Sequence, residues 1–179
     1  MDSVSNQDNL TAAFIGRTVV VRVVGRGSFR ISLPIKKFIQ QVIESDSANC
    51  VLIDMLKCRS MDSTFMGVLA GLSFHIRKKS DFTLKLVNLS EKNEKSLQTL
   101  GVDRVISYSR TCTEEEQKLV SIGENKEQLM KTKPENTVEA AQTTLEAHET
   151  LVNLNPDNLV KFKSVLELLQ EELNNLDKR

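Results

Sequence analysis

The chain has 179 residues, with 24 lysines and arginines against 24 aspartates and glutamates, so its formal net charge at pH 7 is zero. Proteins that bind the phosphate backbone usually carry a clear basic excess, so this balance argues against a general nucleic-acid binder. The opening residues MDSVSNQDNL lack the basic region and apolar core of a signal peptide, and no apolar stretch approaches the roughly 20 residues that span a bilayer.

The cysteine content points to a reducing compartment. Cys50, Cys58 and Cys112 are too few and too scattered for a disulfide framework. Cys50 and Cys58 lie in or beside a predicted buried strand, where cysteine commonly acts as a small apolar residue. We therefore expect a cytoplasmic protein.

The neutral total conceals a division near residue 110. Residues 1–110 carry 16 basic and 10 acidic side chains, whereas residues 111–179 carry 8 and 14. Six of the seven glycines and seven of the eight aromatic residues also lie at or before residue 110. Two regions of different architecture are predicted, and their opposite charges give a weak, salt-screened attraction.

The first region begins with a strand and a helix. A weak signal near residues 12–16 indicates an antiparallel edge strand, and residues 18–24 (TVVVRVV) are typical of a strand buried on both faces. A helix follows, entered through Pro34, a residue suited to a first helical turn. Its apolar stripe consists of Ile35, Phe38, Ile39, Val42 and Ile43.

A second strand and a very apolar helix come next. Residues 50–55 (CVLIDM) predict a buried strand, and the helix after it has apolar residues at spacings of four, three and four. Its interior glycines, Gly67 and Gly71, would each cost about 1 kcal/mol relative to alanine if exposed, so we expect close packing there. The apolar positions are Phe65, Leu69, Leu72 and Ile76.

The first region ends with a third strand over residues 82–89, a short helix from Ser90 to the Leu100-Gly101 stop signal, and a last strand over residues 104–108. Strands and helices alternate throughout. This order predicts an α/β fold with a mainly parallel or mixed sheet covered by helices.

The second region is polar and then helical. Residues 111–136 predict a polar linker with at most one short helix. Two heptad seams follow within residues 137–179, separated by the turn NLNPDN, and they predict a helical hairpin or a coiled-coil-like extension. Such helices must bury their stripes, so we expect them to dimerise or to dock. The seams are Val138, Ala141, Leu145, His148 and Val152, and Leu159, Phe162, Leu166, Leu169, Leu173 and Leu176.

No enzymatic motif stands out, and we expect neither a cofactor nor a bound metal. His75 and His148 have no cysteine or histidine at ligand spacing. The segment VVGRGSFR resembles a phosphate loop only in two glycines, because Arg30 occupies the position of the third glycine. Asp54 and Asp62 are acidic, but no base or oxyanion motif accompanies them.

The segment MDST, residues 61–64, has two interpretations. Asp62 is suited to be the N-cap of the apolar helix, with its carboxylate near the positive end of the helix dipole. The neighbouring Ser63 is either an ordinary polar residue of the first turn or a regulated hydroxyl. The local pattern alone favours the first interpretation.

Residues 50–106 together closely resemble a STAS domain, the module of sulfate transporters and bacterial anti-sigma factor antagonists. The matching blocks are a strand ending in Asp54, the segment MDST, Gly67-Val68-Leu69, Leu86-Val87-Asn88, and the Leu-x-x-Leu-Gly stop at residues 97–101. The resemblance implies a STAS domain over residues 12–110. The predicted linker over 111–136 and the helical extension over 137–179 lie outside it.

In many single-domain antagonists of this family, the serine after the aspartate is phosphorylated by an anti-sigma serine kinase, and that position is Ser63 here. The resemblance implies a partner switch in which the unphosphorylated domain binds the kinase and phosphorylation abolishes binding. The partner surface that it implies consists of Asp62, Thr64, Phe65, Met66, Asp54 and Ser28.

This sequence departs from the family pattern Asp-Ser-Ser/Thr-Gly-Leu-Gly at two positions, where Phe65 and Met66 replace the first glycine and the leucine. Phe65 either reshapes the docking surface or fills the core. Two other functions stay open: a STAS accessory subunit that docks onto a membrane transport complex for lipids or anions, with Ser63 only a helix residue, and a small-molecule-binding or enzymatic α/β domain.

Overall fold

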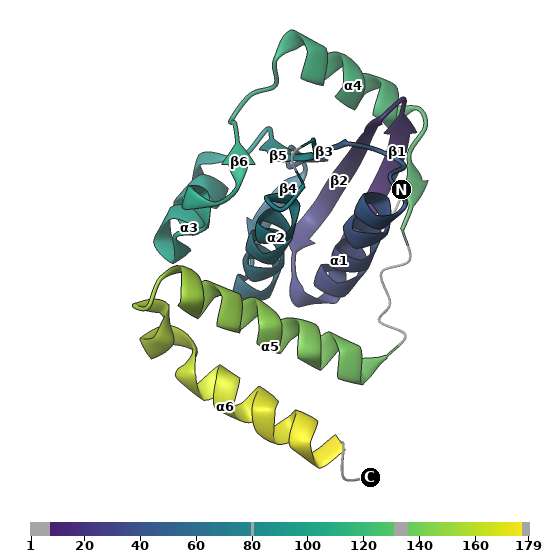
Figure 1. Ribbon diagram of the computed structural model, residues 1–179. Coiled ribbons are helices and arrows are strands. Elements are labelled where there is room, and N and C mark those ends of the chain that lie inside the picture. The colour runs from purple at the N-terminus through teal and green to yellow at the C-terminus, as the bar shows by residue number, and fades with distance from the viewer. Residues whose placement is uncertain (1–7, 80, 131–135, 177–179) are drawn as a thin grey trace, which may run out of the picture.

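The computed structural model describes residues 8–79, 81–130 and 136–176, which form a mixed sheet with helices on both faces and two further helices outside them (Figure 1). The strand order is β6-β5-β3-β2-β1-β7, and β4 also pairs with β2. Strands β2, β3, β4, β5 and β6 run parallel to one another, whereas β1 is antiparallel to both β2 and β7. The predicted α/β class is confirmed.

The elements follow one another as expected through the first region, with a few additions. Their bounds are β1 Asn9–Ile15, β2 Thr18–Gly27, α1 Phe29–Glu44, β3 Cys50–Asp54, β4 Cys58–Met61, α2 Ser63–Ile76, β5 Thr83–Val87, α3 Glu91–Leu100, a 3-10 turn Val102–Arg104, β6 Ser107–Tyr108, α4 Glu114–Glu124, β7 Gln128–Leu129, α5 Thr137–Leu154 and α6 Asn158–Leu176.

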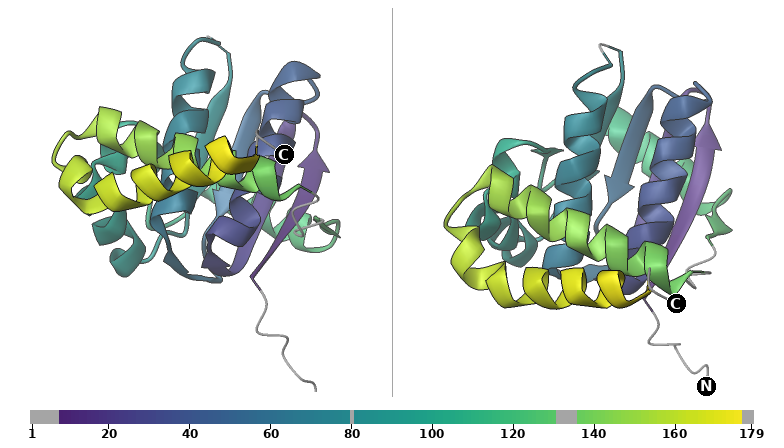
Figure 2. Two further views of the ribbon diagram at one scale, coloured as in Figure 1. Left: turned by 90° about the horizontal axis from the view of Figure 1, so that it is seen from below. Right: turned by 60° about the horizontal axis from the view of Figure 1, so that its bottom comes forward.

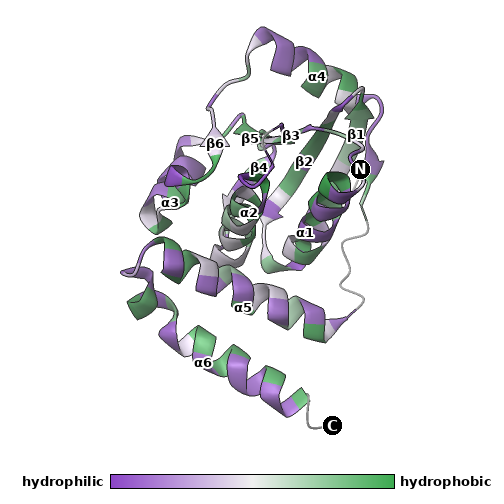
Figure 3. Ribbon diagram, in the orientation of Figure 1, coloured by the Kyte–Doolittle hydropathy of each residue, from purple (hydrophilic) through white to green (hydrophobic). Residues whose placement is uncertain are grey.

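Strand β2 is buried on both faces, as its sequence predicts. Val19, Val21 and Val23 belong to the main core beneath α1 and α2, whereas Val20 belongs to a smaller cluster on the opposite face with Val120 of α4. Alternate side chains of a strand point to opposite faces, so one valine-rich strand serves both cores. The hydropathy colouring accordingly shows β1 and β2 as largely hydrophobic (Figure 3).

Several element predictions need correction. Helix α1 begins at Phe29, so Pro34 lies inside it rather than in its first turn. The glycines of VVGRGSFR lie within β2 and not in a phosphate loop: Gly25 has a φ of 88° at a register shift in the pairing with β4. The predicted last strand over 104–108 shortens to β6, preceded by the 3-10 turn.

Residues 111–130, predicted as a linker with at most one short helix, contain the helix α4 and the unpredicted strand β7, and both lie on the sheet. Helix α4 covers the face opposite α1 and α2, and β7 extends the sheet beyond β1, which is therefore not its edge. A capping box at Thr113 and Glu116 starts α4. Residues 131–135 of the predicted linker lie outside the described residues, and the boundaries of independently folding units stay a prediction.

Helices α5 and α6 lie side by side as a hairpin, and α5 crosses α1 and α2 on the side away from the sheet (Figure 2). The side chains that α5 buries are Thr143, Ala147, His148 and Leu151, so its docked face differs from the predicted heptad seam except at His148. Among the described residues, no helix is long and apolar enough to cross a membrane.

Candidate functional site at the start of α2

The amino-terminal ends of α1 and α2 share one capping carboxylate. Asp62 Oδ1 accepts a hydrogen bond from the Phe65 backbone N–H at 2.8 Å, and Oδ2 accepts one from the Phe29 N–H at 2.7 Å. The predicted cap of α2 is confirmed, and the same side chain also serves α1. A negative charge is favoured here because both helix dipoles point their positive ends at it.

Ser63, the first residue of α2, is partly exposed and contacts the C-terminal hairpin. Its Oγ lies 2.9 Å from Nε2 of His148 in α5, and Nδ1 of the same ring lies 2.8 Å from the carbonyl oxygen of Thr144. A carbonyl only accepts, so Nδ1 carries a proton, and in the neutral imidazole Nε2 accepts a hydrogen bond from the Ser63 hydroxyl. His148 is 4% exposed and packs edge-on against Phe162 of α6 at 4.8 Å between ring centroids.

Helix α5 packs closely against α2 at Gly67. A Cβ built on Gly67 would lie 2.4 Å from the backbone oxygen of Ala147, so only glycine allows this approach. Gly71, one turn later, has room, since its nearest neighbour would be Thr150 Oγ1 at 3.9 Å. The expected close packing is confirmed for Gly67, and its partner is the C-terminal hairpin.

The other residues predicted around Ser63 do not reach the surface. Thr64 and Met66 are each 5% exposed, and Phe65 is fully buried. The Phe65 ring lies against Gly27, where an added Cβ would come within 2.6 Å of Cδ1. Phe65 therefore fills the core, which decides between the two roles left open for it. Within MDST, Asp62 and Ser63 are the partly exposed residues.

Ser28 is buried beside the start of α1, where it is held by an aspartate from the amino-terminal segment. Its Oγ donates to Asp8 Oδ2 at 2.9 Å, and the Arg26 N–H donates to Asp8 Oδ1 at 3.0 Å. Burial acts to raise the pKa of Asp8, but these hydrogen bonds and the Arg26 charge outweigh it, so the pKa lies below its usual value. Ser28 thus has a structural partner of its own.

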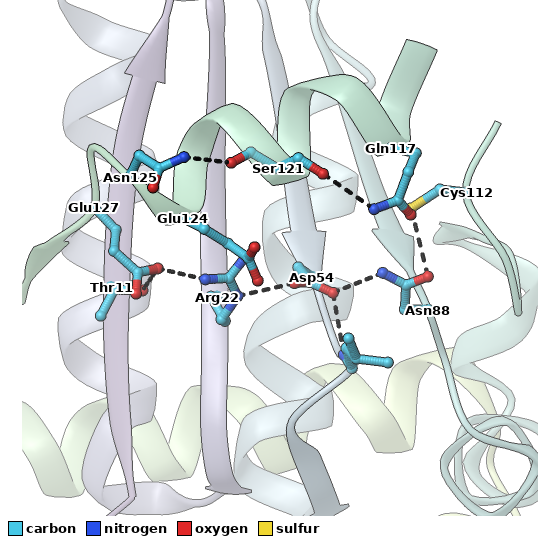
Figure 4. Close-up of polar contacts among 11 residues, drawn as sticks. Thr11, Arg22, Asp54, Asn88, Cys112, Gln117, Ser121, Glu124, Asn125 and Glu127 are labelled. Atoms are coloured by element: carbon cyan, nitrogen blue, oxygen red, sulfur yellow. Dashed lines mark hydrogen bonds and ion pairs between the residues drawn. The ribbon is translucent and has the colours of Figure 1, made fainter. Parts of the chain in front are cut away.

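Asp54 belongs to the opposite face of the sheet, under α4 (Figure 4). Its carboxylate, 0% exposed, accepts hydrogen bonds from Arg22 Nε at 2.9 Å, from Asn88 Nδ2 at 2.8 Å and from the Leu56 N–H at 3.1 Å. The structure therefore does not bring Asp54 and Asp62 together as an acid-base pair, and it does not present Asp54 to a partner.

The charge network around Arg22 was not predicted. Arg22 is 3% exposed, its Nη1 donates to Glu127 at 2.7 Å, and its Nη2 lies 3.4 Å from Glu124 without a hydrogen bond. A single arginine inside a valine-rich strand is the signal that could have indicated a buried ion pair, because such a charge needs partners.

A second ion pair fastens α4 to the sheet. Lys85 Nζ of β5 donates to Glu116 Oε1 at 2.6 Å. Burial acts to raise the pKa of Glu116, but the hydrogen bonds from Lys85 and from the Thr113 N–H lower it by more. The pKa of this carboxyl therefore lies below its usual value. No group of three histidine, cysteine or acidic side chains that could hold a metal occurs within residues 8–79, 81–130 and 136–176.

Comparison with known proteins identifies the family. The family model described as the STAS domain matches residues 9–118, which is more than half of the chain, so the chain belongs to the STAS domain family. The match agrees with the resemblance seen in residues 50–106 and extends into α4. A search of the curated proteins finds no match.

Solved structures of anti-sigma factor antagonists share this fold. The unphosphorylated form of SpoIIAA is 21% identical, with 63% of this chain and 96% of that chain covered at a TM-score of 0.51. A putative antagonist from Thermotoga maritima is 19% identical (61% and 91% covered, TM-score 0.51). One from Mycobacterium paratuberculosis is 16% identical (68% and 98% covered, TM-score 0.51).

Proposed function

We propose that this protein is a non-enzymatic regulatory module of the cytoplasm, an anti-sigma factor antagonist that binds an anti-sigma serine kinase while Ser63 is unphosphorylated. The observation that carries the proposal is the position of Ser63, a partly exposed hydroxyl in the first turn of α2, directly after the capping Asp62. Membership of the STAS family and the shared fold of solved antagonists support it.

Phosphorylation at this position acts electrostatically on partner binding. The kinase transfers the γ-phosphoryl group of ATP to Ser63 Oγ, the hydroxyl proton passes to a base of the kinase, and ADP leaves. The product carries about −1.5 to −2 charges at pH 7 next to the Asp62 carboxylate. A docking partner must desolvate this charge, whereas the N-terminus of α2 tolerates it, so binding is lost and the fold is kept.

The test uses the tagged full-length protein purified from its own cells with phosphatase inhibitors. We expect the tryptic peptide over residues 60–77 to carry a phosphate that Ser63→Ala removes and Ser60→Ala keeps. We also expect an ATP-binding protein kinase to co-purify with the Ser63→Ala variant and to fall at least about tenfold with Ser63→Asp, through like-charge repulsion and desolvation. Equal capture by both variants, or phosphate only elsewhere, would contradict the proposal.

A second candidate function is an accessory subunit docked onto a membrane complex that transports lipids or anions, without a phosphoswitch. One observation favours it: the Ser63 hydroxyl already has a structural partner in His148. In that case the same purification recovers membrane transport proteins, and Ser63→Asp and Ser63→Ala capture them equally.

We further infer that α6 pairs with α6 of a second copy. Val165 is 37% exposed and Leu168 is 65% exposed, while Lys161 and Glu172 are exposed on the same side at spacings of four, three and four. Figure 3 shows hydrophobic residues along α6 among hydrophilic ones. Under two-fold symmetry an antiparallel pair places each lysine opposite the other copy's glutamate and each valine opposite the other copy's leucine.

Light scattering at increasing concentration tests this pairing. The stripe is short, so we expect a weak dimer with a dissociation constant of roughly 10 to 100 μM. Leu168→Glu and Lys161→Glu should each give a monomer, and adding Glu172→Lys to Lys161→Glu should restore the dimer. Asn174→Glu, which adds a charge on another side of α6, should leave it unchanged. A monomer at about 0.5 mM wild-type protein contradicts the inference.

A further inference from the structure

We propose that α5 is a displaceable cover over Ser63, so that the C-terminal hairpin of α5 and α6 competes with the partner protein for the same face of α2. The regulatory meaning of this cover rests on the proposed function of Ser63. The competition itself rests on the contacts between α2 and α5.

Helix α5 contacts the Ser63 hydroxyl directly, through His148. His148 Nε2 lies 2.9 Å from Ser63 Oγ, within hydrogen-bond distance, and the imidazole is itself 4% exposed. A kinase needs this hydroxyl free, both to remove its proton and to align Oγ with the phosphoryl group. While α5 is docked, the hydroxyl is engaged and one side of it is blocked.

A phosphate on Ser63 and the docked hairpin compete for the same space. A phosphoryl group replaces the hydrogen of Oγ, so the hydrogen bond that Oγ donates to His148 is lost, and the group adds bulk beside the buried ring. The Gly67–Ala147 contact leaves α5 no freedom to approach α2 any closer, so relief requires movement away from it. The phosphorylated state therefore favours the open hairpin, and the closed hairpin disfavours phosphorylation by the same factor.

The interface is also weak enough to open. Two partly exposed ion pairs, Lys36–Glu146 and Lys37–Glu139, join α1 to α5, and such pairs contribute little and are screened by salt. Leu151 is the only large aliphatic side chain among the four that α5 buries. An open pocket of about 360 Å³ remains between α1, α2 and α5, so part of the facing surface makes no contact across it.

The turn of the hairpin is held more firmly. The buried Asn158 donates from Nδ2 to the carbonyl oxygens of Leu100 at 3.0 Å and of Leu151 at 2.9 Å. The first bond ties the start of α6 to the end of α3. We therefore expect the hairpin to stay attached at its turn while α5 leaves α2.

Hydrogen–deuterium exchange of the full-length protein tests the cover without any kinase. Gly67→Ala places a methyl group against the Ala147 carbonyl, and we expect the α5 amides, residues 137–154, to exchange at least about tenfold faster. Gly71→Ala adds the same methyl group to the same helix where there is room, so it should leave α5 unchanged. Ala147→Arg should reproduce the opening with α2 intact, and Glu149→Arg, at an exposed position, is its control.

Three substitutions at position 63 complete the test. Ser63→Glu should raise exchange in α5, whereas Ser63→Ala, which removes one hydrogen bond, should have a much smaller effect. The thiol of a Ser63→Cys variant should react with N-ethylmaleimide at least about tenfold faster when Gly67→Ala is also present, as mapped by mass spectrometry.

The outcomes separate this inference from the proposed function. Equal α5 exchange and equal thiol reactivity in the Gly67→Ala and Gly71→Ala backgrounds would overturn the cover and leave the phosphoswitch untouched. Conversely, if α5 opens as expected but no phosphate is ever found on Ser63, the cover stands and the proposed switch fails.

Discussion

Replacing Arg22 by alanine is expected to lower the free energy of unfolding by about 3 to 5 kcal/mol, because it leaves the buried Asp54 carboxylate without its cation. Asp54 is 0% exposed and keeps only the Asn88 amide and the Leu56 N–H as partners. Glu127 loses its ion pair at the same time. Urea denaturation followed by circular dichroism measures the change.

The control is Arg17→Ala. Arg17 pairs with Asp46 at 3.1 Å, but the two side chains are 57% and 84% exposed, so the loss should stay below about 1 kcal/mol. In the double variant Arg22→Ala with Asp54→Ala, the loss should be smaller than the sum of the two single losses, because the unpaired charge is removed. A loss below about 1 kcal/mol for Arg22→Ala would contradict the prediction, because the buried Asp54 carboxylate would then not depend on Arg22.

Replacing Phe65 by alanine is expected to cost about 3 to 5 kcal/mol, the range for a fully buried aromatic residue. The ring is wedged against Gly27, and its removal leaves a cavity between β2 and the first turn of α2. The same denaturation experiment measures the loss. Phe74→Ala, in the same helix but at a site 38% exposed, should cost clearly less.

A substitution at Gly27, which lies against the Phe65 ring, tests this packing independently. Gly27→Ala places a Cβ within 2.6 Å of the ring and should destabilise the wild-type protein by about 1 to 3 kcal/mol. In the Phe65→Ala background this penalty should largely disappear, because the space is then empty. Additive losses would mean that Gly27 is required for its backbone and not for the ring.

The surroundings of Arg22 and Phe65 show which features a local sequence pattern predicts and which it does not. The valine run of β2 predicted a strand buried on both faces, but it did not predict what buries the second face. That role falls to α4, whose sequence is mainly polar and whose inward contacts are a few residues such as Leu119 and Val120. A helix that covers a sheet at so few positions has too weak a periodic pattern to be separated from a linker.

For the C-terminal hairpin too, the sequence pattern predicted the helices but not the surface on which they dock. Its heptad spacing correctly indicated two helices that pack together, because α5 and α6 do contact each other. Of the four side chains that α5 buries, only Leu151 is a large aliphatic one, and Ala147 packs against Gly67. Hydrophobic periodicity does not mark such a face, and the contact partner is about 80 residues away in the sequence.

The sequence by itself determined the alternation of strands and helices, the cap at Asp62 and the candidate hydroxyl at Ser63, because each depends on neighbouring residues and on motifs that are contiguous in the chain. Only the tertiary structure decided that Phe65 and Asp54 are interior, that Arg22 pairs with Asp54 and Glu127, and that His148 contacts Ser63. These outcomes depend on which distant surfaces meet, and on whether a glycine leaves enough room for them to do so.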